Sequence, residues 1–97
     1  MINSMTNATA RPWFSPKVRL RVDRRTGRHL LLYPERGLEL NRSGTEIARL
    51  CTGECTVDDM AQHLARIYVE VPHGDIEREV HDFLNVLAGR GLVQGLP

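Results

Sequence analysis

Residues 30–41 constrain the fold of this chain more than any other segment. They read LLLYPERGLELN, so an apolar run stops at a turn that contains proline and glycine. Residues 38–40 then alternate between leucine and glutamate, and Asn41 follows as a candidate helix cap. A strand with only two apolar side chains on one face is too short for the centre of a sheet, so we expect it at an edge. One row of its backbone N–H and C=O groups would then remain open to another strand.

The residues before this segment predict two further antiparallel strands. Residues 18–22 (VRLRV) alternate apolar and charged side chains, which is typical of a strand with one buried face. Residues 24–27 (RRTG) favour a hairpin turn, because Gly27 can take a positive φ angle. We therefore expect residues 29–33 to form the second strand, and residues 34–37 to turn the chain into the short third strand.

Capping patterns predict the starts of the first two of three helices. The first helix is expected to begin at Asn41 or Ser43, because Ser43 and Glu46 have the spacing of a capping box. Gly53 suits the C-terminal cap of this helix. The second helix is expected to begin at Thr56, where an aspartate three residues later gives a variant of the same box.

The order of the elements predicts the fold class. A third helix is expected from Asp75 to residues 90–91, after which residues 92–93 return to the core or add a short strand. Three strands followed by three helices predict an α+β domain of the winged-helix type, a three-stranded antiparallel sheet followed by a three-helix bundle. Residues 13–97 would form this one domain, and the polar residues 1–12 predict a disordered N-terminal tail.

The location of the protein follows from what the sequence lacks. No apolar run approaches the length of a membrane span, so no membrane partner is expected. The N-terminal residues contain no apolar signal-peptide core, and we therefore expect a cytoplasmic protein.

Charge is distributed unevenly along the chain. Residues 1–30 carry seven basic side chains and one acidic side chain, a balance of +6. Residues 31–97 carry six basic and eleven acidic side chains, a balance of −5. The arginines near the first hairpin predict either a solvated hairpin or a surface that steers an acidic partner, and both interpretations stay open.

The sequence shows no pattern typical of catalysis. It has no glycine-rich phosphate loop after a strand, and no supporting motif joins a nucleophile to a histidine. Cys51 and Cys55 have a spacing that zinc sites use, but only His63 lies nearby as a further ligand. We therefore predict structural thiols, with Cys51 as a small buried hydrophobic residue, and no metal, no cofactor and no enzymatic activity.

A winged helix raises the alternative of a nucleic-acid-binding regulator. Its third helix would have to enter the major groove, yet the first turns carry Asp75, Glu77 and Glu79 against Arg78 alone. Phosphates would repel these carboxylates, and phosphate contacts dominate nucleic-acid affinity. We therefore expect no nucleic-acid partner, and the arginine-rich hairpin is the surface on which this alternative rests.

Residues 31–53, LLYPERGLELNRSGTEIARLCTG, and the helix start Thr56-Val57 that follows carry a family resemblance. They resemble the PqqD family of pyrroloquinoline quinone (PQQ) biosynthesis, and the resemblance extends over about residues 13–95. Two turn positions depart from the family pattern. Arg36 stands between the glutamate and glycine that commonly follow the proline, and Thr52 stands where aspartate is frequent.

The resemblance implies a peptide chaperone. The family resembles the RiPP recognition elements, winged-helix modules that capture the leader segment of a ribosomally made precursor peptide. For PqqD the resemblance implies PqqA as the precursor peptide. It implies PqqE, a radical S-adenosylmethionine enzyme that crosslinks a glutamate and a tyrosine of PqqA, as the enzyme partner. A recognition module for a different precursor peptide stays open as a second alternative.

The resemblance also implies where the peptide binds. In the related modules the peptide adds as a strand beside the third strand and packs against the third helix. On a helical wheel Val86 is apolar but lies well off the core face, and Phe83 fits either the core or a groove. The predicted peptide-binding residues are Arg36, Gly37, Leu38, Glu39, Leu40, Phe83, Val86 and Arg90. The same open edge would also allow two copies of the chain to pair as a homodimer.

Overall fold

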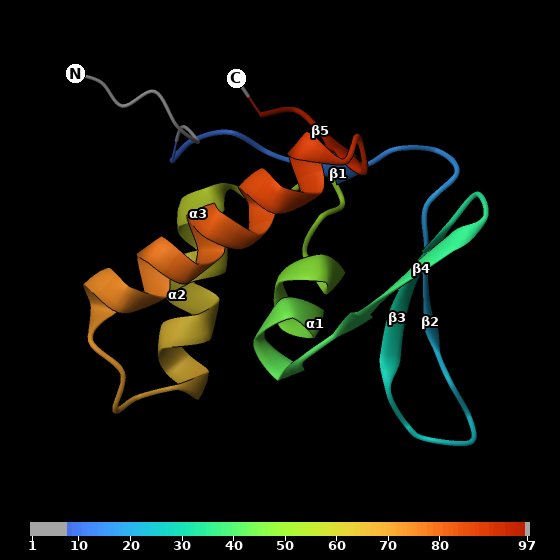
Figure 1. Cartoon of the computed structure of the whole chain (residues 1–97). Helices are drawn as coiled ribbons and strands as arrows, with labels where there is room; N and C mark the ends of the chain where they lie inside the picture. The colour runs from blue at the N-terminus through green and yellow to red at the C-terminus, as the bar shows by residue number, and fades with distance from the viewer. Residues whose placement is uncertain (1–7, 97) are drawn as a thin grey trace.

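The structure is a computed structural model that describes residues 8–96. Figure 1 shows its helices gathered on one side of an antiparallel sheet. In chain order the described elements are β1 (Trp13–Phe14), β2 (Arg19–Val22), β3 (His29–Tyr33), β4 (Arg36–Leu40), α1 (Arg42–Arg49), α2 (Val57–Ile67), α3 (His73–Gly89) and β5 (Val93–Gln94). The predicted α+β order, an antiparallel sheet followed by three helices, is confirmed.

The main sheet has the strand order β2-β3-β4, and both neighbouring pairs are antiparallel. Its register places Leu20, Leu31 and Leu38 side by side, and Leu31 is completely buried. These side chains share the face that packs on the helices, because alternate residues of a strand point to opposite faces. Among the described strands β4 pairs with β3 alone, so the prediction of an edge strand is confirmed.

The edge strand is longer than the sequence predicts. Arg36 and Gly37 belong to β4, where they pair with residues of β3. The turn predicted over residues 34–37 is therefore wrong, because only Pro34 and Glu35 connect the two strands. Proline fixes its own φ angle, and Glu35 takes the left-handed φ of +64° that lets a two-residue connection close.

The start of α1 follows one of the two predicted alternatives. Asn41 is the N-cap, and its side-chain oxygen accepts a hydrogen bond from the Gly44 N–H at 2.8 Å. The alternative start at Ser43 is wrong, because Ser43 already lies in the first helical turn. Gly53 does not cap the helix either, since Leu50 is the C-cap of α1 and Gly53 forms part of the following turn.

The other two helices differ in how well capping residues predict their starts. Thr56 caps α2, and both hydrogen bonds of its capping box with Asp59 are present. By contrast α3 begins at His73 rather than at Asp75, because Pro72 takes the N-cap position and the helix starts directly after it. The predicted end of α3 is confirmed, with Arg90 as its C-cap.

Residues 8–12 pack on α2 and do not form a disordered tail. The first two N–H groups of α2 donate to the carbonyl oxygens of Ala10 and Ala8, at 2.9 and 3.0 Å. These N–H groups have no acceptor within the helix itself, so the segment extends the helix cap. Pro12 is fully buried. The predicted tail is thus wrong over this segment, and residues 1–7 lie outside the described residues.

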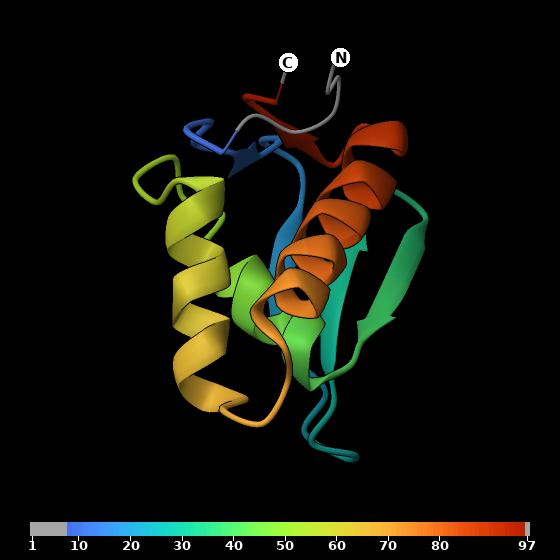
Figure 2. The same cartoon turned by 90° about the vertical axis from the view of Figure 1, so that its left-hand side faces the viewer.

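The core lies between the main sheet and the helices. Its largest fully buried side chains come from β3 and all three helices, and they include Leu31, Ile47, Met60, Leu64, Leu84 and Leu87. Figure 2 shows α2 and α3 side by side, with α1 packed beside both and the sheet behind. None of the helices that the described residues form has both the length and the apolar character needed to cross a bilayer.

A second, two-stranded sheet closes the fold. β1 pairs with β5, which sets Trp13 opposite Gln94 and Phe14 opposite Val93. Leu92 and Val93 are both buried. The two predictions for this segment, a return to the core and a short strand, are therefore both confirmed.

We expect Gly95→Ala to destabilise the protein. Gly95 has a φ angle of +89°, and an added Cβ would lie 2.8 Å from Cε3 of Trp13. Because a left-handed backbone and a steric clash both penalise alanine, urea denaturation should show a loss of about 1–3 kcal/mol in the free energy of unfolding.

Gly89→Ala is the matched control for this prediction. An added Cβ at this helical position meets no heavy atom within 4 Å, so the free energy of unfolding should hold or rise by up to about 1 kcal/mol. An equal loss of stability in both variants would contradict the steric explanation.

Candidate functional site

A groove runs between the edge strand β4 and helix α3, and we call it the β4–α3 groove. It has a volume of about 410 Å³. Its lining residues come from the end of β4, the helix cap that follows, and one side of α3: Leu38, Glu39, Leu40, Asn41, Phe83 and Val86. The groove therefore places an apolar wall beside a strand whose outer edge has no partner among the described strands.

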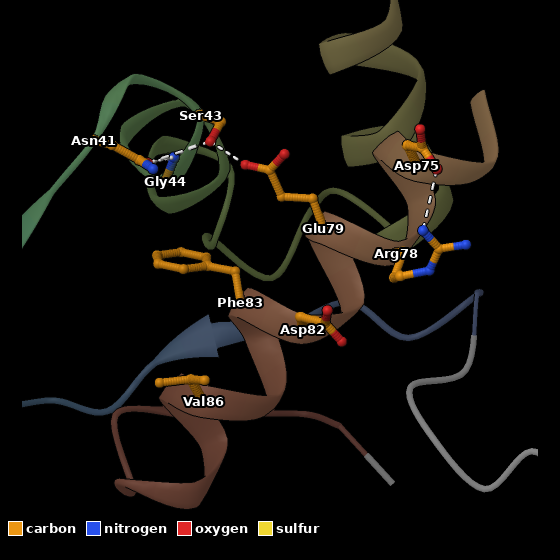
Figure 3. Close-up of a pocket in the computed structure, with 9 residues that line it drawn as sticks. All are labelled: Asn41, Ser43, Gly44, Asp75, Arg78, Glu79, Asp82, Phe83 and Val86. Carbon is orange, nitrogen blue, oxygen red and sulfur yellow. Dashed lines mark hydrogen bonds and ion pairs between the residues drawn. The ribbon is translucent and has the colours of Figure 1, made fainter. Parts of the chain in front are cut away.

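A second hollow, of about 420 Å³, continues the groove towards the first turns of α1 and α3. Figure 3 shows the residues that line it, and most of those beyond the groove itself are polar. The Ser43 hydroxyl donates to a carboxylate oxygen of Glu79, and Arg78 binds Asp75 at 3.1 Å. Asp82 adds a further carboxylate, so this end of the groove is acidic.

Phe83 forms the centre of the groove wall. Its ring is half-buried and packs on the core cluster while one side faces the groove. The ring lies beside Gly44 of α1, where an added Cβ would be 3.3 Å from its Cε1 and Cζ atoms (Figure 3). The missing side chain at Gly44 therefore lets the ring approach the backbone of α1.

Val86 continues the same wall one helical turn after Phe83. Its side chain is 49% exposed, whereas Leu84 and Leu87 on the neighbouring face of α3 are completely buried. Figure 3 shows Phe83 and Val86 projecting to the same side of the helix. The expected position of Val86, apolar but off the core face, is thus the position it occupies.

The remaining predicted residues flank the groove. Arg36 and Gly37 precede the lining residues on β4, so their backbone continues the same open edge. Arg90 follows α3, and its Nη1 lies 3.5 Å from the phenolic oxygen of Tyr33. Tyr33 pairs with Arg36 across the turn, so Arg36 and Arg90 both lie near this residue of β3. Five of the eight predicted residues thus line the groove, and Arg36, Gly37 and Arg90 lie outside its lining.

Two residues of this site are not predicted from the sequence. Asn41 was assigned to helix capping alone, but it also lines the groove because the cap follows β4 without a loop. Gly44 was assigned no role, and its importance lies in the space it leaves for Phe83. The signal in the sequence was a glycine within a helix, which costs about 1 kcal/mol relative to alanine and usually has a packing reason.

The described groups with clearly shifted pKa values lie outside the groove. Burial raises the pKa of the Cys51 thiol to about 12, so this residue is the small buried hydrophobic residue that the sequence predicts. A hydrogen bond from His63 at 2.9 Å lowers the pKa of Glu46, and the Thr56 N–H lowers the pKa of Asp59. These groups join or cap helices, and within residues 8–96 no three His, Cys, Asp or Glu side chains are grouped so that they could hold a metal ion.

We expect Gly44→Ala to move the ring of Phe83 into the groove. The new methyl group would press on the ring and on the Asn41 side-chain oxygen, 3.0 Å away, and the ring can yield because it is only half-buried. Helix propensity would offset part of the cost, so the free energy of unfolding should change by less than about 1.5 kcal/mol. Contacts between Phe83 and Val86 in NOE spectra should change.

Gly74→Ala is the control for this substitution, because no heavy atom lies within 4 Å of its added Cβ. It should leave the NOE contacts of Phe83 as they are. Unchanged contacts in the Gly44 variant as well would show that Gly44 does not set the position of the ring.

Comparison of the sequence with known families and proteins gives consistent matches. Residues 28–93 match the family described as "Coenzyme PQQ synthesis protein D (PqqD)". A "PqqA binding protein" of Rhodopseudomonas palustris is 34% identical over 85 residues, which cover 88% of this chain and 82% of the relative. A "PqqA binding protein" of Methylococcus capsulatus is 29% identical over 80 residues, which cover 82% of this chain and 83% of the relative.

Solved structures share the fold. The solution NMR structure of the PqqD part of Methylobacterium extorquens PqqCD, described as a functional and stand-alone RiPP recognition element, has a TM-score of 0.71 and 31% identity. The match covers 86% of this chain and 87% of that one. A lasso peptide synthetase B1 solved with its leader peptide has a TM-score of 0.75 at 23% identity, with 88% and 99% covered. The second likeness concerns the fold alone.

Proposed function

The chain belongs to the PqqD family, and from this premise we propose that it is a peptide chaperone of PQQ biosynthesis. It binds the precursor peptide PqqA and presents it to the radical S-adenosylmethionine enzyme PqqE in the cytoplasm. The observation that carries the proposal is the outer edge of β4, which has no partner among the described strands, beside the apolar wall of α3. A strand edge and an apolar groove together are what a peptide needs in order to bind as an added strand.

Binding by strand addition uses both parts of the site. The peptide backbone pairs with the N–H and C=O groups that β4 turns outward. Alternate side chains of the peptide then point into the β4–α3 groove, where Phe83 and Val86 offer apolar contact. The other side chains point away from the helices and stay accessible.

The sizes of the free-energy contributions to binding indicate which contacts select the peptide. About four main-chain hydrogen bonds, each worth about 0.5–1.5 kcal/mol net, would be offset by the cost of ordering a disordered peptide, about 2–5 kcal/mol. One or two apolar anchors at about 1.5–3 kcal/mol each would then supply most of the net affinity. The groove should therefore select a peptide by apolar side chains at alternate positions.

In this proposal the chain does no chemistry on the peptide and needs no cofactor. The shifted pKa values belong to helix caps and buried contacts, so they are explained without a reaction. The alternative of a nucleic-acid-binding regulator is disfavoured by the first half of α3, where Asp75, Glu79 and Asp82 surround the hollow that continues the groove.

We expect Val86→Asp to weaken PqqA binding at least tenfold without unfolding the protein. Val86 is half-exposed, so aspartate is tolerated in the free protein, but a bound apolar side chain would lose its contact and meet a charge. Titration of isotope-labelled protein with PqqA measures this. In the wild-type protein, amide shifts should cluster on residues 36–40 and 83–90.

Val69→Asp is the matched control, because Val69 is 78% exposed and lies in the connection between α2 and α3, outside the lining of the groove. Its affinity for PqqA should equal that of the wild-type protein. Equal affinity in the Val86 variant would refute the groove, and no shifts with any variant would refute PqqA binding itself.

A further inference from the structure

The outer face of the main sheet carries two leucines that no described element covers. In the register of the sheet Leu30 lies between Arg21 and Glu39, and Leu32 lies between Arg19 and Gly37. Leu32 is 40% exposed, and Leu30 is half-buried without packing on the core cluster. Figure 1 shows the helices on the opposite side of this sheet. An alternating strand normally places polar residues on such a solvent face, so a leucine pair there is unexpected.

Arginines on β2 border these leucines, and their charges are not neutralised within the described chain. The Arg19 guanidinium donates to the carbonyl oxygens of Pro16 and Val18, and that of Arg21 donates to the carbonyl of Leu20. Neither forms an ion pair with a carboxylate among residues 8–96. The outer face therefore combines an apolar centre with arginines along its β2 side, whereas Glu39 on the β4 side already binds Arg28 at 2.8 Å.

This combination selects one class of partner. A second copy of the chain, docked through the same face, would have to offer a carboxylate to these arginines, and the carboxylate that the register places beside Leu30, that of Glu39, already binds Arg28. Nucleic acid would satisfy the arginines but would gain nothing from the leucines, because phosphate contacts dominate its affinity. A protein surface with acidic residues around an apolar centre satisfies both parts.

The position of the face relative to β4 indicates what such a protein does. A strand added at β4 extends the main sheet, so half of the peptide's side chains would join the outer face next to Gly37 and Glu39. Gly37 has no side chain, so at this position of β4 no side chain stands between Leu32 and the added strand. A protein docked on the outer face would therefore also touch the accessible side chains of the bound peptide.

We propose that the outer face of the main sheet, formed by Arg19, Arg21, Leu30 and Leu32, is the surface that docks the enzyme to which the peptide is presented, through an acidic surface with an apolar centre. This inference rests on the proposed function. It divides the molecule between two partners, with the peptide held from the helix side and the enzyme held on the sheet side.

The test measures the affinity of PqqE and of PqqA separately, by isothermal titration, for variants of the full chain whose folding is checked by NMR. Arg21→Glu and Leu32→Ser should each weaken PqqE binding at least tenfold and leave PqqA binding within twofold of wild type. Added salt should weaken PqqE binding to the wild-type protein more than to the Arg21 variant. Arg66→Glu, on the exposed side of α2, repeats the charge change elsewhere and should leave both affinities unchanged.

Three results would overturn the inference. Equal PqqE affinity of both outer-face variants and the wild-type protein would place the PqqE contact elsewhere while PqqA binding stands. A wild-type protein that binds PqqA but has no affinity for PqqE would refute enzyme docking and leave peptide binding intact. Self-association or DNA binding that the outer-face variants abolish would assign the face to a second copy or to nucleic acid. If the wild-type protein does not bind PqqA, the proposed function itself fails, and this outcome differs from the three above.

Discussion

The complete burial of Leu31 fixes the register of the main sheet, and both surfaces of that sheet depend on the register. A shift by one residue would turn Leu30 and Leu32 towards the helices and expose Leu31 to solvent. If the pairing of β3 with β4 moved with it, Leu38 would leave the groove for the opposite face. One buried side chain therefore determines which residues line the β4–α3 groove and which residues lie on the outer face of the sheet.

Helix α1 converts this register into a defined groove. Asn41 directly follows the last residue of β4 and is the N-cap of α1, so no loop separates the edge strand from the helix. Gly44 has no side chain and so leaves room for the ring of Phe83. Phe83 in turn packs on the core and forms part of the groove wall. A binding site on rigid elements loses less conformational entropy when it is occupied than a site on loops.

The sequence predicts those parts of the fold that depend on local patterns. Alternation gave β2 and the last three residues of β4, and the capping box at Thr56 gave the start of α2, because each involves residues a few positions apart. The site was predictable to the extent that family resemblance named β4 and a helical wheel singled out Val86. Contacts between distant segments were not predictable in this way. Nothing in the sequence distinguishes the carbonyl groups of Ala8 and Ala10, which accept hydrogen bonds from α2, from those of other residues. The close approach of Phe83 to Gly44 arises only when α3 packs on α1.

The hydrogen bonds from α2 to Ala8 and Ala10 make these residues part of the folded structure. A chain shortened to Trp13 would retain every strand and helix, yet the first two N–H groups of α2 would lose their acceptors. The first turn of α2 would then fray, and its amide protons would exchange with solvent at a rate set by local opening rather than by global unfolding. Because α2 packs along α3, a frayed α2 would also loosen the helix that forms one wall of the groove.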